Sequence, residues 1–240
     1  MKEFRVLAAA LGMILISLIV SGVRSVVVMS ESATFDIYDD SEKLVALTFD
    51  DGPKEGKTEP LLDMLNEKGV HATFFIIGAQ VEENSEIVRR MYEEGHQIGM
   101  HTYSHVDLSC LSEARQKEEI EKSRKVIETV IGAERLLLRP PFGKLNQALE
   151  NWLDCPMILW SVDTEDWMGK SAEEMIRETA ENVRDGDIIL MHDISDDGLA
   201  GAAGIIDELR RMGYTFLTVD ELFACRNIEL EDGITYRRAR

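Results

Sequence analysis

The fold of this protein is best predicted from residues 44–53, which read LVALTFDDGP. An apolar run of this length that stops at a Gly-Pro turn is typical of a buried strand. Successive side chains of a strand point to opposite faces, but a sharp turn after Asp51 can bring Asp50 and Asp51 toward one pocket. We therefore expect a strand that ends in a catalytic site, where one carboxylate holds a metal and the other stays free.

Outward from this stretch, short apolar or β-branched runs alternate with longer helical patterns. The pattern predicts strands at 44–49, 72–77, 97–100, 136–138, 157–162, 188–191 and 215–219. It predicts helices at 59–68, 85–94, 112–131, 145–152, 172–183 and 202–212. This alternation indicates an α/β fold in a single domain, either a distorted (β/α) barrel of about seven parallel strands or an open doubly wound sheet. We prefer the barrel, because the sequence contains no GxGxxG and no P-loop.

Polar residues follow several predicted strands at their C-terminal ends, where a (β/α) barrel builds its active site. They are Asp50, Asp51, His101, Arg139, Asp163 and His192. His105 lies four residues after His101, a spacing that would place both imidazoles on one face of a helical turn. With Asp51 they offer a metal ion one carboxylate and two imidazoles, and leave positions open for water and substrate. Taken alone, each motif also fits a plain turn or a surface helix.

Five motifs in order resemble those of the polysaccharide deacetylases, the NodB-type domain of carbohydrate esterase family 4. They are TFDDGP at 48–53, HTYSH at 101–105, RPPFG at 139–143, DTEDW at 163–167 and LMH at 190–192. Two positions depart from the family pattern: Pro140 stands where many members have an aromatic residue, and Phe142 where others have Tyr. The resemblance covers residues 44–223 and implies a metal-dependent hydrolase that removes acetyl groups from a glycan.

The resemblance also implies a role for each matching residue. Asp50 would be the general base and Arg139 would orient it, while His192 would be the general acid and Asp166 would orient that imidazole. The remaining roles are metal ligands for Asp51, His101 and His105, oxyanion stabilisation for the backbone N–H of Phe142, and the acetyl pocket for Trp167 and Leu190.

Several residues also have simple structural interpretations. Trp167 and Leu190 fit an ordinary core, and Asp163 fits a structural cap or an acceptor for a neighbouring group. We expect His71 and His96, which match no motif, to be structural. We expect the acidic cluster of Asp193, Asp196 and Asp197 to form a solvated loop.

The implied cofactor is one divalent metal ion, with Zn²⁺ as first choice, although an Asp-His-His set also accepts Co²⁺, Ni²⁺ or Mn²⁺. The loops around the motifs are short, which suggests an open groove for a polymer. The expected substrate is N-acetylglucosamine in cell-wall peptidoglycan; chitooligosaccharide, N-acetylmuramic acid and acetylxylan stay open. Two other classes also stay open: a catalytically silent glycan-binding protein and an amidohydrolase of small amides.

The N-terminus carries an uncharged run at residues 6–23, preceded by Lys2 and Arg5 and followed by Arg24. A run of 18 residues with no Ala-x-Ala after it favours a membrane anchor over a cleaved signal. The positive flank predicts the N-terminus inside and an extracytoplasmic domain; secretion after signal cleavage is the alternative. The expected division is 1–29 signal or anchor, 30–43 linker, 44–225 deacetylase-like domain and 226–240 C-terminal tail.

Composition excludes some partners. The chain of 240 residues is 45% hydrophobic and 30% charged, and its net charge of -19 argues against nucleic acid or anionic lipid as the main partner. No protein partner is predicted. Cys110, Cys155 and Cys225 are odd in number and widely spaced, which fits neither a disulfide framework nor a CxxC metal site. We expect them to be small buried apolar residues, with at most one bridged pair.

Overall fold

The computed structural model describes residues 16–20, 23–29, 35–39, 42–132, 135–193 and 196–240, and it divides into two units, Met1–Ser41 and Glu42–Arg240. In the first unit β1 (Ile16–Val20), β2 (Val23–Met29) and β3 (Phe35–Asp39) form an antiparallel sheet. Of the predicted membrane span 6–23, residues 6–15 and 21–22 lie outside the described residues, and Ile16–Val20 is a strand. Among the described residues, no helix has the length and apolar character needed to cross a membrane.

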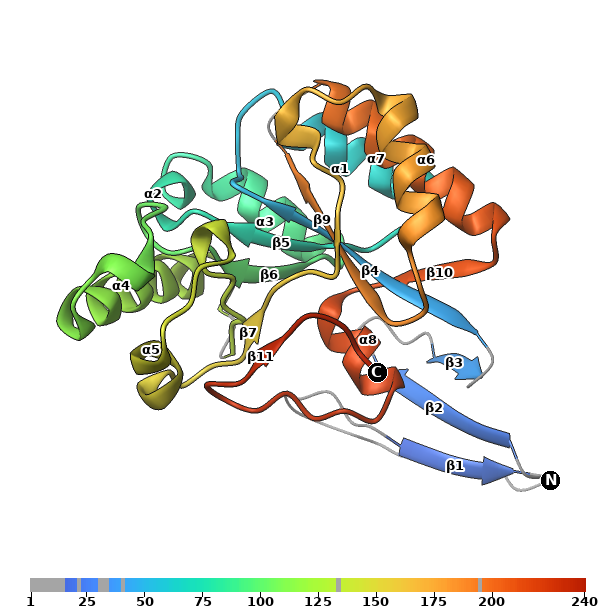
Figure 1. Ribbon diagram of the computed structural model, residues 1–240, viewed down its shortest axis with the longest axis horizontal. Helices are drawn as coiled ribbons and strands as arrows, with labels where there is room; N and C mark the ends of the chain where they lie inside the picture. Colours follow the sequence, from blue (N-terminus) through green and yellow to red (C-terminus); the bar gives the residue numbers. More distant parts are fainter. Residues whose placement is uncertain (1–15, 21–22, 30–34, 40–41, 133–134, 194–195) are drawn as a thin grey trace. The chain divides into compact units, whose positions relative to one another are not determined.

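β4 (Lys43–Asp50) is the centre of the parallel sheet in the second unit, and all its side chains after Lys43 are buried. Strands covered on both faces read as continuous apolar runs, which is why residues 44–49 do so. The strand order is β6 (Gln97–Met100), β5 (Thr73–Ile76), β4, β9 (Asp187–His192) and β8 (Val162–Asp163), while β10 (Tyr214–Leu217) pairs with the first half of β4 (Figure 1). Because these pairings are parallel, the C-terminal strand ends meet at one edge.

Two single bridges continue the sheet beyond β6. Leu138 bridges Met100 on one side and Met157 on the other, both in parallel. The chain continues from β7 (Met157–Ile158) into β8, and β8 pairs with β9. Because β9 pairs with β4, the order of pairing returns to the central strand. The predicted parallel α/β order is confirmed. However, the strand predicted at 136–138 is only a bridge. The strand predicted at 157–162 is divided, because Met157–Ile158 pairs with residues 235–236 whereas Val162–Asp163 pairs with β9.

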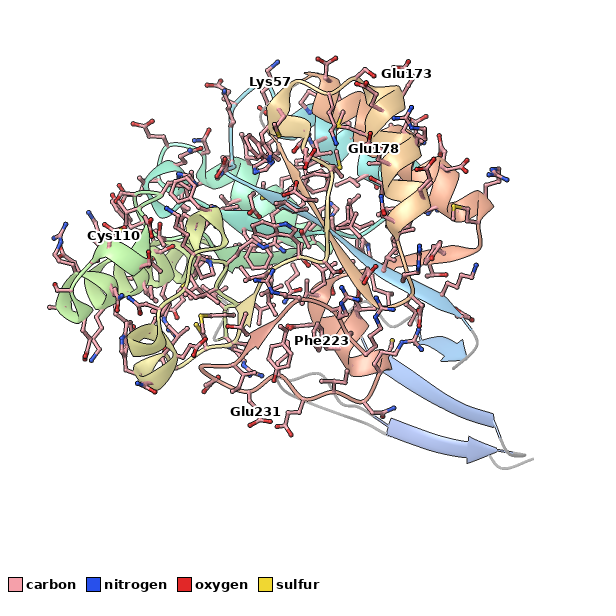
Figure 2. All side chains as sticks on the ribbon, viewed as in Figure 1. Lys57, Cys110, Glu173, Glu178, Phe223 and Glu231 are labelled. Carbon is pink, nitrogen blue, oxygen red and sulfur yellow. The ribbon has the colours of Figure 1, made fainter. Side chains whose placement is uncertain are left out.

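Helices form the outer layer of this unit and contact one another in the order α6, α7, α1, α3, α4, α5 (Figure 1). Their bounds are α1 Thr58–Lys68, α3 Ser85–Glu93, α4 Glu113–Ile131, α5 Gln147–Trp152, α6 Ala172–Asn182 and α7 Asp196–Arg211. The first five are close to the predicted helices, whereas α7 begins six residues before the predicted start at 202. The sequence pattern misses two short helices, α2 (Gly78–Val81) and α8 (Val219–Cys225). Helix α8 replaces the end of the last predicted strand, because Thr218 and Glu221 form a capping box. Glu173 of α6 is exposed, whereas Phe223 of α8 is buried (Figure 2).

The C-terminal segment 226–240 packs against the sheet. β11 (Thr235–Tyr236) pairs with β7, and the ring of Tyr236 meets that of Phe223 with centroids 5.2 Å apart. Arg240 donates to the carboxylate of Asp187 at 2.9 Å. The segment therefore belongs to the same unit as residues 44–225, and it pairs with β7.

The three cysteine thiols are free, and Cys155 and Cys225 are buried. Cys110 is exposed (Figure 2). Burial raises the pKa of both buried thiols to about 12. The expectation of small buried residues is therefore correct for two of the three.

His96 is a buried imidazole at the start of the sheet, away from the strand ends that carry the motifs. Its Nδ1 accepts a hydrogen bond from the N–H of Ala72 at 3.1 Å, so the ring is neutral with its proton on Nε2. Burial, together with the charges of His71 and Arg90, lowers the pKa of His96 to about 4.

This pKa predicts a loss of stability in acid. Between pH 6.5 and 4 the unfolded chain binds the extra proton more readily, so stability falls as pH falls. The His96→Asn variant keeps an acceptor for the N–H of Ala72 but does not titrate there. The free energy of unfolding of the wild type is therefore expected to fall by about 3 kcal/mol relative to that of the variant between pH 7 and pH 4, in urea titrations. Parallel pH curves for the wild type and His96→Asn would contradict the assignment.

Candidate functional site

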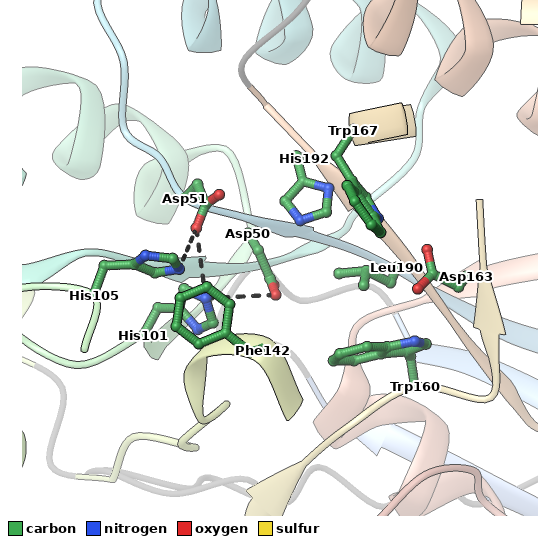
Figure 3. Close-up of a pocket in the computed structure, with 10 residues that line it drawn as sticks. All are labelled: Asp50, Asp51, His101, His105, Phe142, Trp160, Asp163, Trp167, Leu190 and His192. Atoms are coloured by element: carbon green, nitrogen blue, oxygen red, sulfur yellow. Dashed lines mark ion pairs between the residues drawn. The ribbon is translucent and has the colours of Figure 1, made fainter. Parts of the chain in front are cut away.

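Strand β4 ends at the site with two adjacent carboxylates. Asp50 is 3% exposed and Asp51 is half-buried, with a positive φ of 77° that few non-glycine residues adopt. This turn lets both side chains face the same pocket (Figure 3). The next residue has to be glycine, because a Cβ on Gly52 would lie 2.1 Å from the carboxylate of Asp193. The predicted sharp turn after Asp51 is confirmed.

Arg139 is fully buried beneath Asp50. Its Nη1 donates to Asp50 Oδ1 at 2.7 Å and to the hydroxyl of Thr48 at 2.8 Å, and its Nε donates to the carbonyl of Ile158 at 3.0 Å. The guanidinium also stacks on the ring of Phe75, 4.1 Å from its centroid. Burial lowers the pKa of Arg139, while the charge and hydrogen bond of Asp50 oppose that effect. These contacts hold one oxygen of Asp50 and leave Oδ2 directed toward His101.

The two predicted imidazoles lie on a loop rather than on a helical turn. Residues 101–105 are not helical, and Thr102 and His105 have positive φ values of 62° and 54°. The prediction of a helical turn was therefore wrong. The prediction that the two imidazoles lie together is confirmed, with ring centroids 5.1 Å apart. His101 Nε2 lies 3.5 Å and His105 Nε2 lies 3.2 Å from the same oxygen, Oδ1 of Asp51 (Figure 3).

The donor atoms of Asp51, His101 and His105 fit a metal ion. They lie within 4.8 Å of one another, and Asp51 Oδ1 is buried without a hydrogen-bond partner. Nδ1 of His101 lies 2.7 Å from the carbonyl of Arg139 and must donate its proton there, so a lone pair on Nε2 faces carboxylate oxygens. Burial lowers the pKa of His101, which favours this neutral form. A cation between these acceptors resolves their mutual repulsion.

Asp51 is ionised in this setting. Burial raises the pKa of its carboxyl, but the neighbouring His105, His101 and His192 outweigh burial and hold the pKa below its ordinary value. A deprotonated carboxylate is the form that binds a metal.

His192, at the end of β9, is held by Asp166 from the 3₁₀ turn Asp166–Met168. Nδ1 of His192 lies 2.8 Å from Asp166 Oδ1, and the backbone N–H of His192 donates to Asp166 Oδ2 at 2.7 Å. Burial lowers the pKa of His192, but the hydrogen bond and charge of Asp166, with smaller contributions from Asp50 and Asp51, raise it overall. The imidazole is therefore oriented and biased toward its protonated form, as a general acid requires.

This arrangement predicts a pH shift in the Asp166→Asn variant. Loss of the carboxylate charge should lower the pKa of His192, so that the protonated acid disappears at lower pH. The alkaline limb of the pH profile of kcat/KM is expected to move to lower pH, as measured by acetate release. Asp163→Asn serves as the control, because Asp163 lines the same pocket without a bond to His192. An unmoved alkaline limb would exclude His192 as the acid held by Asp166.

The pocket above these groups has a volume of about 450 Å³. Besides the charged residues, its walls are Phe142, Trp160, Asp163, Trp167 and Leu190. Leu190 is buried at the base, whereas Trp167 and Phe142 are each 59% exposed at the rim. Trp167 and Leu190 therefore line the pocket, and an ordinary core position is wrong for Trp167.

Two features of the site escape sequence reasoning. Trp160 forms a pocket wall, and its ring lies so close to Gly143 that a Cβ there would meet it at 2.9 Å. Asp193 is 5% exposed and accepts a hydrogen bond from the hydroxyl of Thr58 at 2.6 Å, so the expected solvated loop is wrong at this residue. A loop is also wrong for Asp196 and Asp197, which belong to helix α7. Burial raises the pKa of Asp193 to about 7. The position of Trp160 between two motifs was a signal available in the sequence. The burial of Asp193 depends on a contact with Thr58, 135 residues away, which no sequence pattern indicates.

Comparison with known proteins identifies relatives of this chain. Residues 38–154 match the family model described as polysaccharide deacetylase. A protein of Listeria monocytogenes named peptidoglycan-N-acetylglucosamine deacetylase PgdA is 38% identical over 183 residues, which are 76% of this chain and 39% of that protein. This chain thus spans about two fifths of that relative's length. A Bacillus cereus protein named peptidoglycan-N-acetylglucosamine deacetylase is 37% identical over 190 residues, covering 76% of this chain and 89% of that protein.

Solved structures share the fold. A family 4 acetyl xylan esterase from Clostridium thermocellum, described in complex with a cobalt ion, superposes with a TM-score of 0.78 at 32% identity. The match covers 82% of this chain and 98% of that structure. The relatives therefore include proteins named for different acetylated glycans.

Proposed function

This chain belongs to the polysaccharide deacetylase family, and we propose that it removes N-acetyl groups from N-acetylglucosamine residues of a cell-wall polysaccharide, with peptidoglycan as first choice. The observation that carries the proposal is that three groups of residues converge on one pocket. They are the Asp50–Arg139 pair, the Asp51–His101–His105 group and the His192–Asp166 pair. Our candidates for the base, the metal ligands and the acid of a hydrolase thus line one hollow (Figure 3).

Asp50 is our candidate for the general base. Its Oδ1 is held by Arg139, so Oδ2 is the oxygen left to take a proton from the attacking water. A charge-assisted bond to Arg139 makes a carboxylate less basic but fixes its position, so geometry is what the pair contributes. A divalent ion, Zn²⁺ by preference, would be held by Asp51, His101 and His105 and would polarise the amide carbonyl and acidify the water.

His192 faces the pocket from β9 and would donate a proton to the departing amine, since Asp166 biases it toward the protonated form. The backbone N–H of Phe142 is our candidate for oxyanion stabilisation. Phe142 has a positive φ of 63° and its ring contacts His105 with centroids 4.9 Å apart, which places this backbone beside the ligand group. Trp167 and Leu190 would enclose the acetyl methyl.

An open site favours a polymeric substrate. A second hollow of about 620 Å³ lies against α2 and shares Asp51 and His105 with the first. Two hollows on either side of the ligand group can accommodate sugars on both sides of the reacting unit. The exposed Trp167 and Phe142 offer apolar faces for sugar rings. Chitooligosaccharide, N-acetylmuramic acid and acetylxylan are the competing substrates in the same assay.

We also propose extracytoplasmic action, with residues 6–23 as the membrane anchor. Support comes from the uncharged run and its positive flank, and from relatives named for cell-wall substrates. Fractionation of cells that express the full chain tests this: the protein should remain with membranes after a high-salt wash. Recovery of a shortened protein in the medium would instead favour a cleaved signal.

The test of function is acetate release from peptidoglycan, chitooligosaccharides and acetylxylan, with chelator and after addition of Zn²⁺. Release from peptidoglycan that chelator abolishes and Zn²⁺ restores is the expected result. Release only from acetylxylan would overturn the choice of peptidoglycan. Binding of peptidoglycan without release from any substrate would favour the glycan-binding alternative, and turnover of small amides alone would favour the amidohydrolase.

A further inference from the structure

We propose that Glu119, on helix α4, is a positioning residue that holds the loop carrying His101 and His105 in the shape that binds the metal. It acts through Ser104, which directly precedes His105 in the sequence. This inference rests on the proposed metal site, and it gives that site a support 15 residues beyond Ser104 in the sequence. We call residues 101–105 the ligand loop.

Both carboxylate oxygens of Glu119 are committed to the ligand loop. Oε2 accepts from the backbone N–H of Ser104 at 2.9 Å, and Oε1 accepts from the hydroxyl of the same residue at 2.8 Å. Glu119 is only 7% exposed, whereas its neighbours Glu118 and Glu121 on α4 are exposed and pair with arginines of the same helix. A buried carboxylate with both oxygens on one residue is a strong and specific restraint.

The ligand loop needs such a restraint because its backbone is strained. Thr102 and His105 both have positive φ, which is unfavourable for residues with a Cβ. Such a conformation persists only where surrounding contacts impose it. The two strained residues flank Ser104, so the bonds from Glu119 act on the part of the backbone where strain is stored.

Helix α4 and helix α2 hold the remaining residues of the loop. Lys122, one turn after Glu119, places its ammonium 3.6 Å from the ring centroid of Tyr103. The N–H groups of Gly78 and Ala79 donate to the carbonyls of Thr102 and Tyr103. Gly78 is needed for this approach, since a Cβ there would lie 3.0 Å from both Tyr103 and Ser123. We call these contacts and those of Glu119 the clamp, in which Glu119 supplies the anion.

The position of the loop matters for the metal because the ligands converge closely. Nε2 of His101 and Nε2 of His105 face one oxygen of Asp51 at 3.5 and 3.2 Å. Relaxation of His105 toward an ordinary φ would move its imidazole away from this oxygen. Release of the clamp should therefore weaken metal binding more than it weakens the fold, and outer contacts of this kind commonly change metal affinity about 10- to 100-fold.

The test compares the wild-type protein with the Glu119→Gln variant, both freed of metal by a chelator. The substitution keeps the size of the side chain but replaces one hydrogen-bond acceptor by a donor. Titration with Co²⁺, followed by its absorption spectrum, and with Zn²⁺ by calorimetry, gives the dissociation constants. We expect Glu119→Gln to raise them about 10- to 100-fold and Glu118→Gln, the matched exposed control, to leave them unchanged. Thermal melting of the metal-free proteins shows whether each variant is folded.

The Ser104→Ala variant tests whether Glu119 acts through Ser104. It also replaces Glu119→Gln in the metal titrations if that variant fails to fold. It removes the hydroxyl bond and keeps the N–H bond, so an increase of about two- to tenfold in the dissociation constant is expected. Adding it to Glu119→Gln should cost less than the two single changes combined, because both act through the same residue.

Unchanged dissociation constants in folded Glu119→Gln would overturn the inference, and so would a lowered melting temperature of the metal-free protein with no change in metal affinity. Both leave the proposed deacetylase intact. Conversely, a wild type that binds metal and releases no acetate would overturn the proposed function, while the ratio of the dissociation constants still decides the role of Glu119.

Discussion

Asp50→Asn is expected to lower kcat about 10²- to 10⁴-fold, which is the usual contribution of a general base. The amide oxygen can still accept from Arg139 Nη1, so the pocket should keep its shape, but the side chain can no longer take a proton. Metal affinity should stay close to that of the wild type, because the ligand group consists of Asp51, His101 and His105. Steady-state acetate release and Co²⁺ titration of the same preparation measure the two properties.

The contrast is His101→Ala, which should lose both metal and turnover. His101 is 3% exposed and contributes a ring nitrogen that no neighbouring residue can replace. If Asp50→Asn emerged without metal, Asp50 would be a ligand and the division of roles between the two adjacent carboxylates would be wrong. If it retained full turnover, another base would have to be sought in the pocket.

Arg139→Met is expected to destabilise the protein by about 3–5 kcal/mol, the usual cost of leaving a buried charge without its partner. Methionine fills much of the volume, but Asp50 would remain as a buried carboxylate with no cation beside it. The carbonyl of Ile158 and the hydroxyl of Thr48 would also lose a donor. Urea unfolding of the metal-free proteins gives the difference, and a loss in turnover should accompany it, because Asp50 is no longer held.

The double variant Asp50→Asn with Arg139→Met separates charge from packing. It contains neither buried charge, so it should be more stable than Arg139→Met alone. The two changes would then couple by a favourable free energy measurable in the same urea titrations. Equal losses in the single and double variants would mean that the guanidinium contributes through its contacts with Phe75 and the backbone, and that the ion pair adds nothing.

Sequence patterns were sufficient for the strand-end residues. The residues predicted at strand ends all lie at the pocket or directly against it, because the order of parallel strands brings their C-terminal ends together. They are Asp50, Asp51, His101, Arg139, Asp163 and His192. The sequence pattern predicted the short strands at 136–138 and 157–162 incorrectly. Residues 136–138 lack a ladder apart from Leu138, and residues 157–163 are divided because their backbone bonds to a C-terminal segment that the pattern classed as a tail.

The HTYSH motif shows the limit most clearly. A spacing of four residues suggested a helical turn, yet the imidazoles converge through positive φ at Thr102 and His105. Local propensity disfavours that backbone, so only contacts from other elements impose it. Those contacts come from Glu119 and the N–H groups of α2, and neither belongs to a motif.

The sequence by itself determined the α/β order and the sheet edge where the polar residues meet, because these follow from local periodicity and from the parallel arrangement. The candidate catalytic side chains came from the five motifs and the resemblance that they carry. The tertiary structure alone decided which oxygen of Asp50 is held, that Asp193 is buried against Gly52, that Trp160 is a wall, and that Glu119 reaches Ser104. Each of these depends on packing between residues far apart in the chain, and a pattern with a period of two or of 3.6 residues carries no information about such partners.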